Sequence, residues 1–200
     1  MPDFERAKVV AVGGSCRYGT ADGRQRRGER RSAVIIGRSK ARVDDTVAEL
    51  RSRGGEASGI AAELTDRSAV SDVQRAPSES RGDATSLVNA AGFFVPKAFL
   101  DYDAQFYDSY MDLNYALFFL TQTVVNGRIA KGVGGSIVNI GSMRAHQAGL
   151  TPSSGYSMQK ARLHALTHNL AIELAEHKIR VNAVAPAVVR TPCTKVHPQG

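Results

Sequence analysis

The sequence lacks the features that mark several classes of protein. It contains two cysteines, Cys16 and Cys193, too few for the disulfide framework of a small secreted protein. No stretch approaches the roughly 18 consecutive apolar residues of a membrane-spanning helix. The first dozen residues carry charges of both signs and run straight into an apolar segment, unlike a signal peptide. We therefore expect no membrane partner and a cytoplasmic, reducing environment.

The sequence also has nothing that would divide the chain into separate units. It has 200 residues, of which 42% are hydrophobic, and it shows no internal repeat, linker or low-complexity tract. A chain of this length and composition can bury a substantial core. We expect a single domain over residues 1–200.

Positive charge is concentrated in one segment. The formal net charge is +7 at pH 7, and residues 17–31 hold six arginines against two acidic residues. A basic run of this kind can bind nucleic acid, but no aromatic stacking pattern or nucleic-acid motif accompanies it. We therefore expect no nucleic-acid partner. A basic interaction module is kept as the third and weakest hypothesis of function.

Two kinds of apolar pattern alternate along the chain. Six segments are predicted as strands: residues 7–12, 33–37, 56–62, 86–89, 136–140 and 179–185. Helical patterns predict helices at residues 41–53, 66–80, 103–130 and 155–177, although Pro77 would strain the second of them. This alternation predicts an α/β fold, a doubly wound parallel sheet between two layers of helices. Ligands of such a sheet bind beyond the carboxyl ends of its strands, where the strand order reverses.

Tyr156, Lys160 and Ser142 are the residues that suggest a chemistry. Tyr156 and Lys160 are four positions apart in a predicted helix, so their side chains share a face. An ammonium group beside a phenol favours the phenolate, which can exchange a proton with a substrate oxygen near neutral pH. Ser142 could hold that oxygen by a hydrogen bond. The three suit proton transfer to or from a carbonyl or alcohol, although a Tyr-x-x-x-Lys pair alone is more often a solvated helix face.

The context of these residues resembles the short-chain dehydrogenase/reductase family over essentially the whole chain. The segments that carry the resemblance follow one another in the family's order: the glycine-rich residues 12–19, the Asn-Ala-Ala-Gly segment 89–92, Asn114, the segment 137–142, the segment 180–186, and Thr191. The resemblance implies a three-layer Rossmann fold. It further implies transfer of a hydride between a nicotinamide cofactor and a small alcohol or carbonyl substrate.

The resemblance also implies a role for individual residues. In the catalytic set, Tyr156 would pass the proton, Lys160 would favour its phenolate, Ser142 would orient the oxygen, and Asn114 would hold a water that links Lys160 to solvent. The cofactor-binding set is Gly13, Ser15, Gly19, Arg38, Asp66, Asn89, Ala90, Gly92, Tyr156, Lys160, Pro186, Val189 and Thr191. Within that set Asp66 would meet the adenine, Asn89 would line the cleft, and Thr191 with the backbone near Val189 would meet the carboxamide. No metal is expected.

Arg38 bears on the choice of cofactor. It follows Gly37 at the end of the second predicted strand, where users of NAD generally carry an acidic residue that holds the ribose hydroxyls. An arginine there can pair with a 2′-phosphate through charge-assisted hydrogen bonds. We expect NADP(H) in preference to NAD(H). The alternative is an ordinary loop arginine in water.

The glycine-rich segment and the residues after it depart from the family pattern. Arg17 stands at the position of the middle glycine, and residues 20–32 have no apolar face for a helix against the sheet. We interpret residues 16–32 as aberrant and hypothesise a compensated frameshift. An unambiguous DNA sequence across codons 15–33 that encodes the printed residues would refute it.

The end of the sequence is the second departure. Eight residues follow Pro192, whereas members of the family continue with a substrate lid, a further helix and a seventh strand. We expect a C-terminally truncated Rossmann domain without that last helix and strand. An inactive or cofactor-binding-only fragment is therefore the alternative function. The substrate stays open, and the side chains that could face its pocket are Tyr102, Arg144, His146 and Gln147.

Two predicted helices suggest an assembly. The apolar stripes of residues 103–130 and 155–177 are long, and Tyr115, Phe118 and Phe119 add aromatic surface. By family resemblance, these helices pair with their counterparts in a second subunit. We expect a homodimer, with the tetramer of full-length relatives weakened because its other interface uses the absent C-terminal region. Arg162 is a counter-signal, since the family usually has a small residue at that position.

Overall fold

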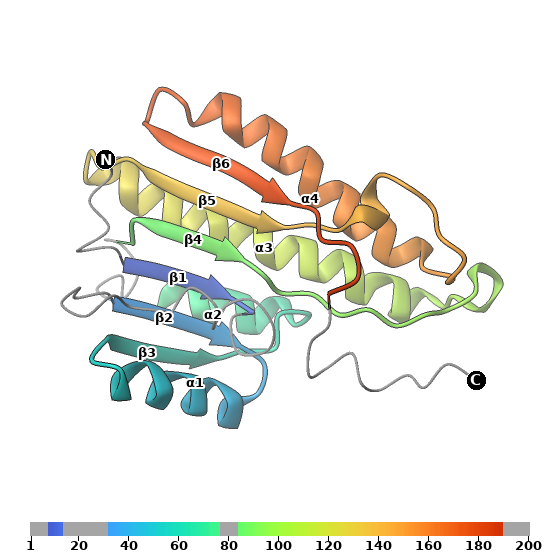
Figure 1. Ribbon diagram of the computed structural model, residues 1–200, viewed down its shortest axis with the longest axis horizontal. Helices are drawn as coiled ribbons and strands as arrows, with labels where there is room; N and C mark the ends of the chain where they lie inside the picture. Colours follow the sequence, from blue (N-terminus) through green and yellow to red (C-terminus); the bar gives the residue numbers. More distant parts are fainter. Residues whose placement is uncertain (1–7, 14–31, 77–83, 190–200) are drawn as a thin grey trace.

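The computed structural model describes residues 8–13, 32–76 and 84–189. In this part of the chain, six strands form one parallel sheet in the order β3-β2-β1-β4-β5-β6 (Figure 1). The strands are β1 (Lys8–Val12), β2 (Ser32–Gly37), β3 (Glu56–Ala61), β4 (Ser86–Asn89), β5 (Gly135–Ile140) and β6 (Ile179–Val184). The strand order reverses between β1 and β4. The predicted doubly wound parallel sheet is therefore confirmed.

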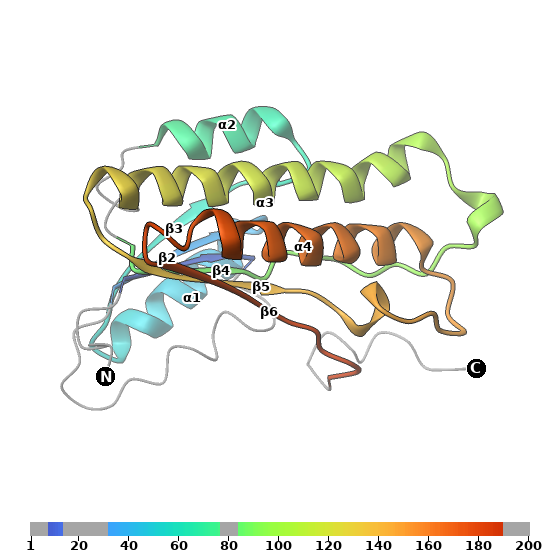
Figure 2. The ribbon, with the colours of Figure 1, turned by 90° about the horizontal axis from the view of Figure 1, so that it is seen from above.

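Helices lie on both faces of this sheet. The helix α1 (Lys40–Ser52) covers one face beside β2 and β3, whereas α2 (Arg67–Arg75), α3 (Ala104–Ala130) and α4 (Ser154–Glu173) cover the other (Figure 2). Two short 3-10 helices, η3 (Phe99–Asp101) and η4 (Met143–Ala145), lie in the loops after β4 and β5. The three-layer arrangement agrees with the prediction. None of the helices in the described ranges is long and apolar enough to cross a membrane.

Two helices end earlier than the sequence pattern predicts. The helix α2 stops at Arg75 rather than near residue 80. A proline such as Pro77 disfavours helical backbone at the residue before it and has no N–H to donate to the hydrogen bonds of a helix. At its other end, the side chain of Asp66 caps α2 by accepting from the backbone N–H of Ser68. The helix α4 stops at Glu173, and the chain turns into β6 through Lys178, whose φ is 57°.

Apolar side chains pack on both faces of the central strands. Because side chains alternate along a strand, Val10 and Val34 face the α2–α4 layer, whereas Ala11 and Ile35 face α1. All four are buried. This explains why β1 and β2 are continuous apolar runs instead of alternating ones. The larger core lies under α3 and α4 and sets their distance from the sheet.

A chain of polar side chains crosses that core. The amide nitrogen of Asn89 donates to Thr121 Oγ1 at 2.9 Å and to Asn139 Oδ1 at 2.8 Å. Asn139 in turn donates to Thr167 Oγ1 at 2.8 Å. All four side chains are buried, so these bonds form in a medium of low dielectric constant, where they are strong. They fix the position of α3 and α4 over β4 and β5.

Arg128 is a second polar group in this layer, near the end of α3. It is fully buried, and its Nε donates to the carbonyl oxygen of Ala84 at 2.5 Å. Its two terminal nitrogens have no hydrogen-bond partner within the described ranges. Burial lowers the pKa of this guanidinium to about 10. A buried charge with so few partners among the described residues opposes folding.

Candidate active site

Four loops meet at the carboxyl edge of the sheet. Gly13 follows β1, the segment 90–92 follows β4, Ser142 follows β5, and the segment 185–189 follows β6. The backbone N–H of Gly13 donates to Ile36 at 2.7 Å, and that of Ala90 donates to Val12 at 2.8 Å, so the loops leave the sheet in a fixed direction. This edge, at the reversal between β1 and β4, is where doubly wound sheets bind ligands.

Two glycines bring these loops close together. Gly13 has φ +80°, and a Cβ built on it would lie 2.4 Å from the backbone of Ala91. A side chain there would force apart the loops after β1 and β4. A Cβ on Gly92 would lie 3.2 Å from the Nζ of Lys160, so the glycine keeps the space beside that ammonium group clear. The loops after β1 and β4 therefore approach each other backbone to backbone where the two halves of the sheet meet.

Lys160 is the buried charge of the site. Its side chain is 3% exposed, and its Nζ donates to the carbonyl oxygen of Ile140 at 2.8 Å. Burial lowers the pKa of this amine to about 8. The Nζ lies 5.8 Å from the centre of the Tyr156 ring, which confirms the prediction that the two side chains share a face of the helix. The ammonium group is thus beside the phenol and shielded from water.

Tyr156 lies in the first turn of α4, in contact with other aromatic rings. Its ring meets the edge of Phe94 at 5.0 Å between centres and that of Tyr110 at 6.4 Å. Tyr110 is fully buried and stacks on Phe93 at 4.4 Å. Burial, more than any other cause, raises the pKa of Tyr110 to about 12, so this neighbour keeps its proton near neutral pH. The rings confine the Tyr156 side chain from the α3 side.

Ser142 and Asn114 approach the same place from other elements. Ser142 is buried two residues after Ile140, the residue that accepts the Lys160 hydrogen bond, and its Oγ accepts from the N–H of Arg144 at 3.2 Å. Asn114 is half-buried on α3. The structure therefore gathers the predicted catalytic residues at one edge, on α3, α4 and the loop after β5.

Gln159 is a neighbour of this group that the sequence reasoning missed. It is fully buried directly before Lys160, and its amide nitrogen lies 3.4 Å from the Oδ1 of Asn114. The other amide atoms, Asn114 Nδ2 and Gln159 Oε1, have no hydrogen-bond partner in the described part of the chain. Such buried atoms in protein interiors are commonly satisfied by an ordered water. A polar residue inside an otherwise apolar helix stripe was the available signal.

The residues predicted to bind the nucleotide part of a cofactor fall into three groups. Gly13, Ala90, Gly92, Pro186 and Val189 all lie in the loops of the carboxyl edge. The predicted sites Ser15, Gly19 and Thr191, and the aberrant segment up to residue 31, lie outside the described residues. Those of the third group, Arg38, Asp66 and Asn89, follow or end strands.

Arg38 and Asp66 are both exposed beyond the carboxyl ends of β2 and β3. The Nε of Arg38 is 3.8 Å from a carboxylate oxygen of Glu63, a loose pairing for a side chain that is 79% exposed. Asp66 is occupied as the cap of α2, and its hydrogen bonds with the hydroxyl and then the backbone N–H of Ser68 lower its pKa. Both residues follow strands of the β2–β3 side of the sheet.

Asn89 occupies a different position from the one its motif suggests. Its side chain has no exposed surface, and its amide nitrogen is shared between Thr121 and Asn139. The side chain therefore serves the interior, and a contact with a ligand would fall to its backbone. Its role in cofactor binding stays a prediction.

The four residues considered for a substrate pocket are also placed by the structure. The guanidinium of Arg144 lies over Gly149, where a Cβ would come within 1.3 Å of it, and His146 meets the ring of His164 at 4.4 Å. Gln147 is exposed in the same loop, whereas Tyr102 contacts the beginning of α4. Arg144, His146 and Gln147 thus belong to one loop directly after Ser142.

The lowered pKa of Lys160 predicts how stability depends on pH. Its folded-state pKa of about 8 lies below the ordinary value of 10.5, so the unfolded chain binds this proton more tightly. Between these two values stability therefore rises with pH. We expect the unfolding free energy of wild type, relative to Lys160→Met, to rise on the order of 2 kcal/mol between pH 7 and pH 10. Urea unfolding at each pH measures it.

The matched control is Lys131→Met, which removes an exposed lysine at the end of α3. Comparison with this variant separates the effect of burial from the loss of one positive charge. A gap between wild type and Lys160→Met that stays constant across this pH range, or that follows the control, would contradict the buried position of the ammonium group.

Comparison with known proteins extends this description. A family model described as short chain dehydrogenase matches residues 8–199. The L-xylulose reductase of Bos taurus is 44% identical over 112 residues, which are 56% of this chain and 46% of the relative. The 2-dehydro-3-deoxy-D-gluconate 5-dehydrogenase of Dickeya dadantii is 33% identical over 159 residues, 78% of this chain and 62% of the relative. The chain thus spans about half to three-fifths of the length of these relatives.

Solved structures give the same result. The L-sorbose reductase of Gluconobacter frateurii, in complex with NADPH and L-sorbose, superposes with a TM-score of 0.84 at 27% identity, covering 94% of this chain and 72% of that one. An alcohol dehydrogenase of Comamonas testosteroni that is specific for bulky-bulky ketones gives a TM-score of 0.80 at 31% identity, covering 92% and 75%. With the family model matched along nearly the whole sequence, the chain belongs to the short-chain dehydrogenase/reductase family.

Proposed function

We propose that the protein is a single-domain, NADP(H)-dependent oxidoreductase that interconverts a small alcohol and its carbonyl compound. The observation that carries the proposal is the Lys160 ammonium group, buried beside the Tyr156 ring at the carboxyl edge of the sheet. A charge held there at a cost in desolvation is typical of a functional site, and an ammonium group beside a phenol suits proton exchange with a substrate oxygen. The protein has two cysteines and only short apolar runs, which supports a cytoplasmic location.

The residues of the crevice fit a nicotinamide dinucleotide. Gly13 lets the loops after β1 and β4 meet closely, and Gly92 leaves room beside the Lys160 Nζ, as a ligand that lies along the backbone of these loops requires. Lys160 would hold the ribose next to the nicotinamide, and Pro186 with the backbone near Val189 would border the ring. When bound, the nicotinamide supplies or accepts the hydride.

The protein's own residues would handle the proton. In the direction of reduction, the Tyr156 hydroxyl donates its proton to the substrate carbonyl oxygen while the Ser142 hydroxyl holds that oxygen by a hydrogen bond. The substrate carbon gains a hydride and its oxygen a proton, which yields the alcohol. Lys160 stabilises the phenolate that remains on Tyr156, and Asn114 would hold a water that returns a proton from solvent. Oxidation follows the same steps in reverse.

The substrate class receives support from two sources. Phe94 and the loop that carries His146 and Gln147 border Tyr156 and Ser142, so the site offers both an apolar and a polar side. Two similar proteins are named as reductases of the sugars L-xylulose and L-sorbose. These names favour a small carbonyl compound with hydroxyl groups.

The proton-transfer role of Tyr156 is tested by Tyr156→Phe. This change removes the hydroxyl and keeps the ring contacts with Phe94 and Tyr110. We expect kcat to fall by about 10²–10⁴-fold, the usual contribution of general acid–base catalysis, while the NADPH dissociation constant stays nearly unchanged. Steady-state kinetics and fluorescence titration with NADPH measure the two quantities. A variant that keeps more than about a tenth of wild-type kcat would refute this role.

Measurements of NADPH binding and turnover with the wild-type chain decide between the proposal and its alternative. A wild-type chain that binds NADPH but turns over none of a panel of sugars, polyols, steroids and short ketones would be a cofactor-binding-only or inactive fragment. Salt-sensitive binding of nucleic acid that is lost when the arginines of residues 17–31 are neutralised would instead select the basic interaction module.

The preference for NADP(H) rests on Arg38. Its exposed guanidinium at the end of β2 pairs only loosely with Glu63, so it remains available to a 2′-phosphate. The NADPH in the structure of the similar L-sorbose reductase supports this preference.

Replacing Arg38 with aspartate should reverse the preference. In Arg38→Asp the carboxylate repels the phosphate and can accept hydrogen bonds from ribose hydroxyls. We expect the ratio of kcat/KM for NADPH over NADH to fall by about tenfold or more, the worth of a lost charged hydrogen bond. Arg53→Asp, at the opposite end of α1, makes the same change of charge and is the control. An equal ratio in wild type and Arg38→Asp would remove Arg38 from the site.

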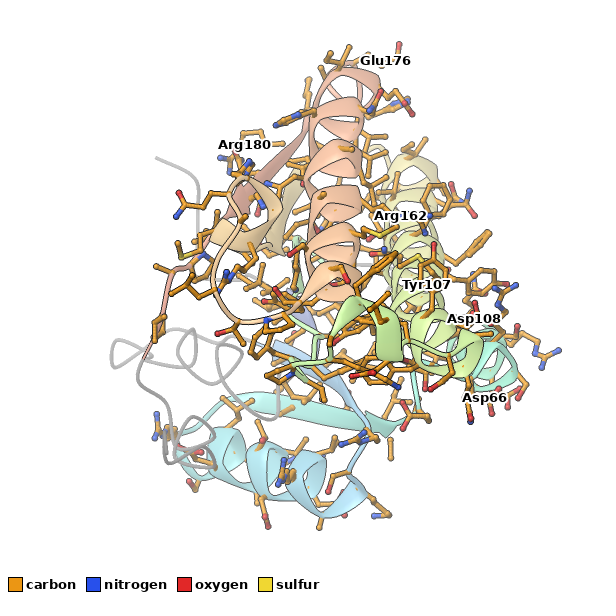
Figure 3. The ribbon with its side chains drawn as sticks, turned by 90° about the vertical axis from the view of Figure 1, so that its right-hand side faces the viewer. Asp66, Tyr107, Asp108, Arg162, Glu176 and Arg180 are labelled. Carbon is orange, nitrogen blue, oxygen red and sulfur yellow. The ribbon has the colours of Figure 1, made fainter. Side chains whose placement is uncertain are left out.

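The proposed assembly is a homodimer through α3 and α4, with a tetramer in the full-length form. These helices lie next to each other on the outer side of the sheet (Figure 2), and Phe118, Met158 and Ile172 are exposed on them. Arg162 extends across to α3, where its Nη1 lies 2.5 Å from the Sδ of Met111, so its bulk lies along the protein's own surface (Figure 3). A flat two-fold interface can accommodate it.

Static light scattering at micromolar concentration tests this assembly. We expect a mass of about twice the 21.4 kDa of the chain. A monodisperse monomer would count against the dimer. A stable tetramer would contradict the expectation that this chain lacks the second interface.

A further inference from the structure

The first turn of α4 begins without the usual cap. The residue at its N-cap position, Ser153, makes no side-chain hydrogen bond to the helix backbone. The first N–H groups of a helix have no partner within the helix and must find one elsewhere. Here the N–H of Gly155 donates to the hydroxyl oxygen of Tyr102 at 3.1 Å, across 53 positions of sequence. A distant tyrosine therefore takes the place of the missing cap.

The contact between Tyr102 and Gly155 is closely fitted. A Cβ built on Gly155 would lie 2.8 Å from the Tyr102 ring, 3.0 Å from its hydroxyl oxygen and 3.0 Å from the Tyr110 ring. Such separations are shorter than van der Waals contact, so both rings rest directly on the backbone of the helix. Glycine at this position is what allows the hydroxyl of Tyr102 to reach the N–H group.

The segment that carries Tyr102 is itself held in place. The Nζ of Lys97 binds Asp103 at 2.8 Å and lies 4.4 Å from the centre of the Phe106 ring. The backbone N–H of Lys97 donates to Pro152 at 3.3 Å, and Asp103 caps α3. The Tyr102 ring meets the edge of Phe106 at 5.2 Å. Tyr102 is thus fixed between the start of α3 and the start of α4.

Tyr156 directly follows the capped residue. It lies in the first turn of α4, the part of a helix that frays first when its N–H groups lose their partners. Proton transfer needs the donor oxygen within hydrogen-bond reach of the substrate, and a displacement of about 1 Å can cost about 100-fold in rate. The hydroxyl of Tyr102 acts on the backbone that carries the reacting phenol.

We propose that Tyr102 is a positioning residue: it caps α4 at Gly155 and thereby holds Tyr156 in place for proton transfer. The inference rests on the proposed function, because it assigns Tyr102 a task in that reaction. It also links the 93–103 segment, which borders Tyr156 through Phe94, to the catalytic helix. A substrate that contacts that segment would therefore also affect the position of the Tyr156 hydroxyl.

The test is Tyr102→Phe, which removes the accepting oxygen and keeps the ring. The matched control is Tyr107→Phe, at a half-buried tyrosine of α3 (Figure 3). We expect the amide protons of Gly155 and Tyr156 to exchange with solvent about fivefold faster in Tyr102→Phe, the effect of a lost helix cap. We expect kcat to fall by a similar factor or more, with the NADPH dissociation constant unchanged. The control should match wild type in all three measurements.

The outcomes separate the two proposals. Hydrogen exchange measured by NMR needs no turnover, so it tests the cap even if the wild-type chain proves inactive and the proposed function fails. Unchanged exchange at Gly155 and Tyr156 would overturn the cap. Faster exchange with wild-type kcat would show that the cap exists but does not position Tyr156, and would also overturn the proposal. A weaker NADPH affinity accompanying the loss of kcat would point to a general disturbance of the crevice and count against it.

Discussion

The hydrogen bond from the Lys160 ammonium group to the carbonyl oxygen of Ile140 organises the carboxyl edge of this protein. It joins a helix to the end of a central strand at 2.8 Å, through a charge that is almost entirely withdrawn from water. A buried ammonium group is costly unless it is paired, so α4 must be placed where a carbonyl meets it. Because Ser142 follows Ile140 by two residues and Tyr156 precedes Lys160 by one helical turn, this contact also sets the relation between the two proposed catalytic hydroxyls.

The other buried polar groups of the α3–α4 layer differ in how fully they are hydrogen-bonded. Beneath the helices, Asn89 and Asn139 form a chain of short hydrogen bonds with threonines of α3 and α4, which holds the helices in register with the strands. Tyr102 holds the start of α4 from outside. At the other end of the layer, Arg128 is buried, and within the described residues its one hydrogen bond is to Ala84. The hydrogen bonding of these buried groups is therefore incomplete at both ends of the layer: within the described residues, Asn89 Oδ1, Asn114 Nδ2 and Gln159 Oε1 lack a partner, as do the two terminal nitrogens of Arg128.

Much of this could be read from local patterns, and some could not. Apolar periodicity located the six strands and four α-helices of the described part, but not the short helices η3 and η4, because period and burial depend on neighbouring residues. The shared face of Tyr156 and Lys160 follows from helix geometry in the same way. By contrast, the Gln159–Asn114 contact and the Tyr102–Gly155 hydrogen bond join residues 45 and 53 positions apart. No rule of residue spacing predicts contacts between residues so far apart in the sequence. The motif that contains Asn89 likewise did not indicate that its side chain faces the interior.

By itself, then, the sequence determined the order of strands and helices, the family, and the residue types that gather at the carboxyl edge, since each of these is written in short segments. The tertiary structure decided which of those side chains face the crevice and which serve the core. It also decided where a charge could be buried and which tyrosine stands in for a helix cap. These outcomes depend on how α3, α4 and the loops pack against one another. The close contacts at Gly13 and Gly155, which leave no room for a Cβ atom, form only when all of these elements are in place.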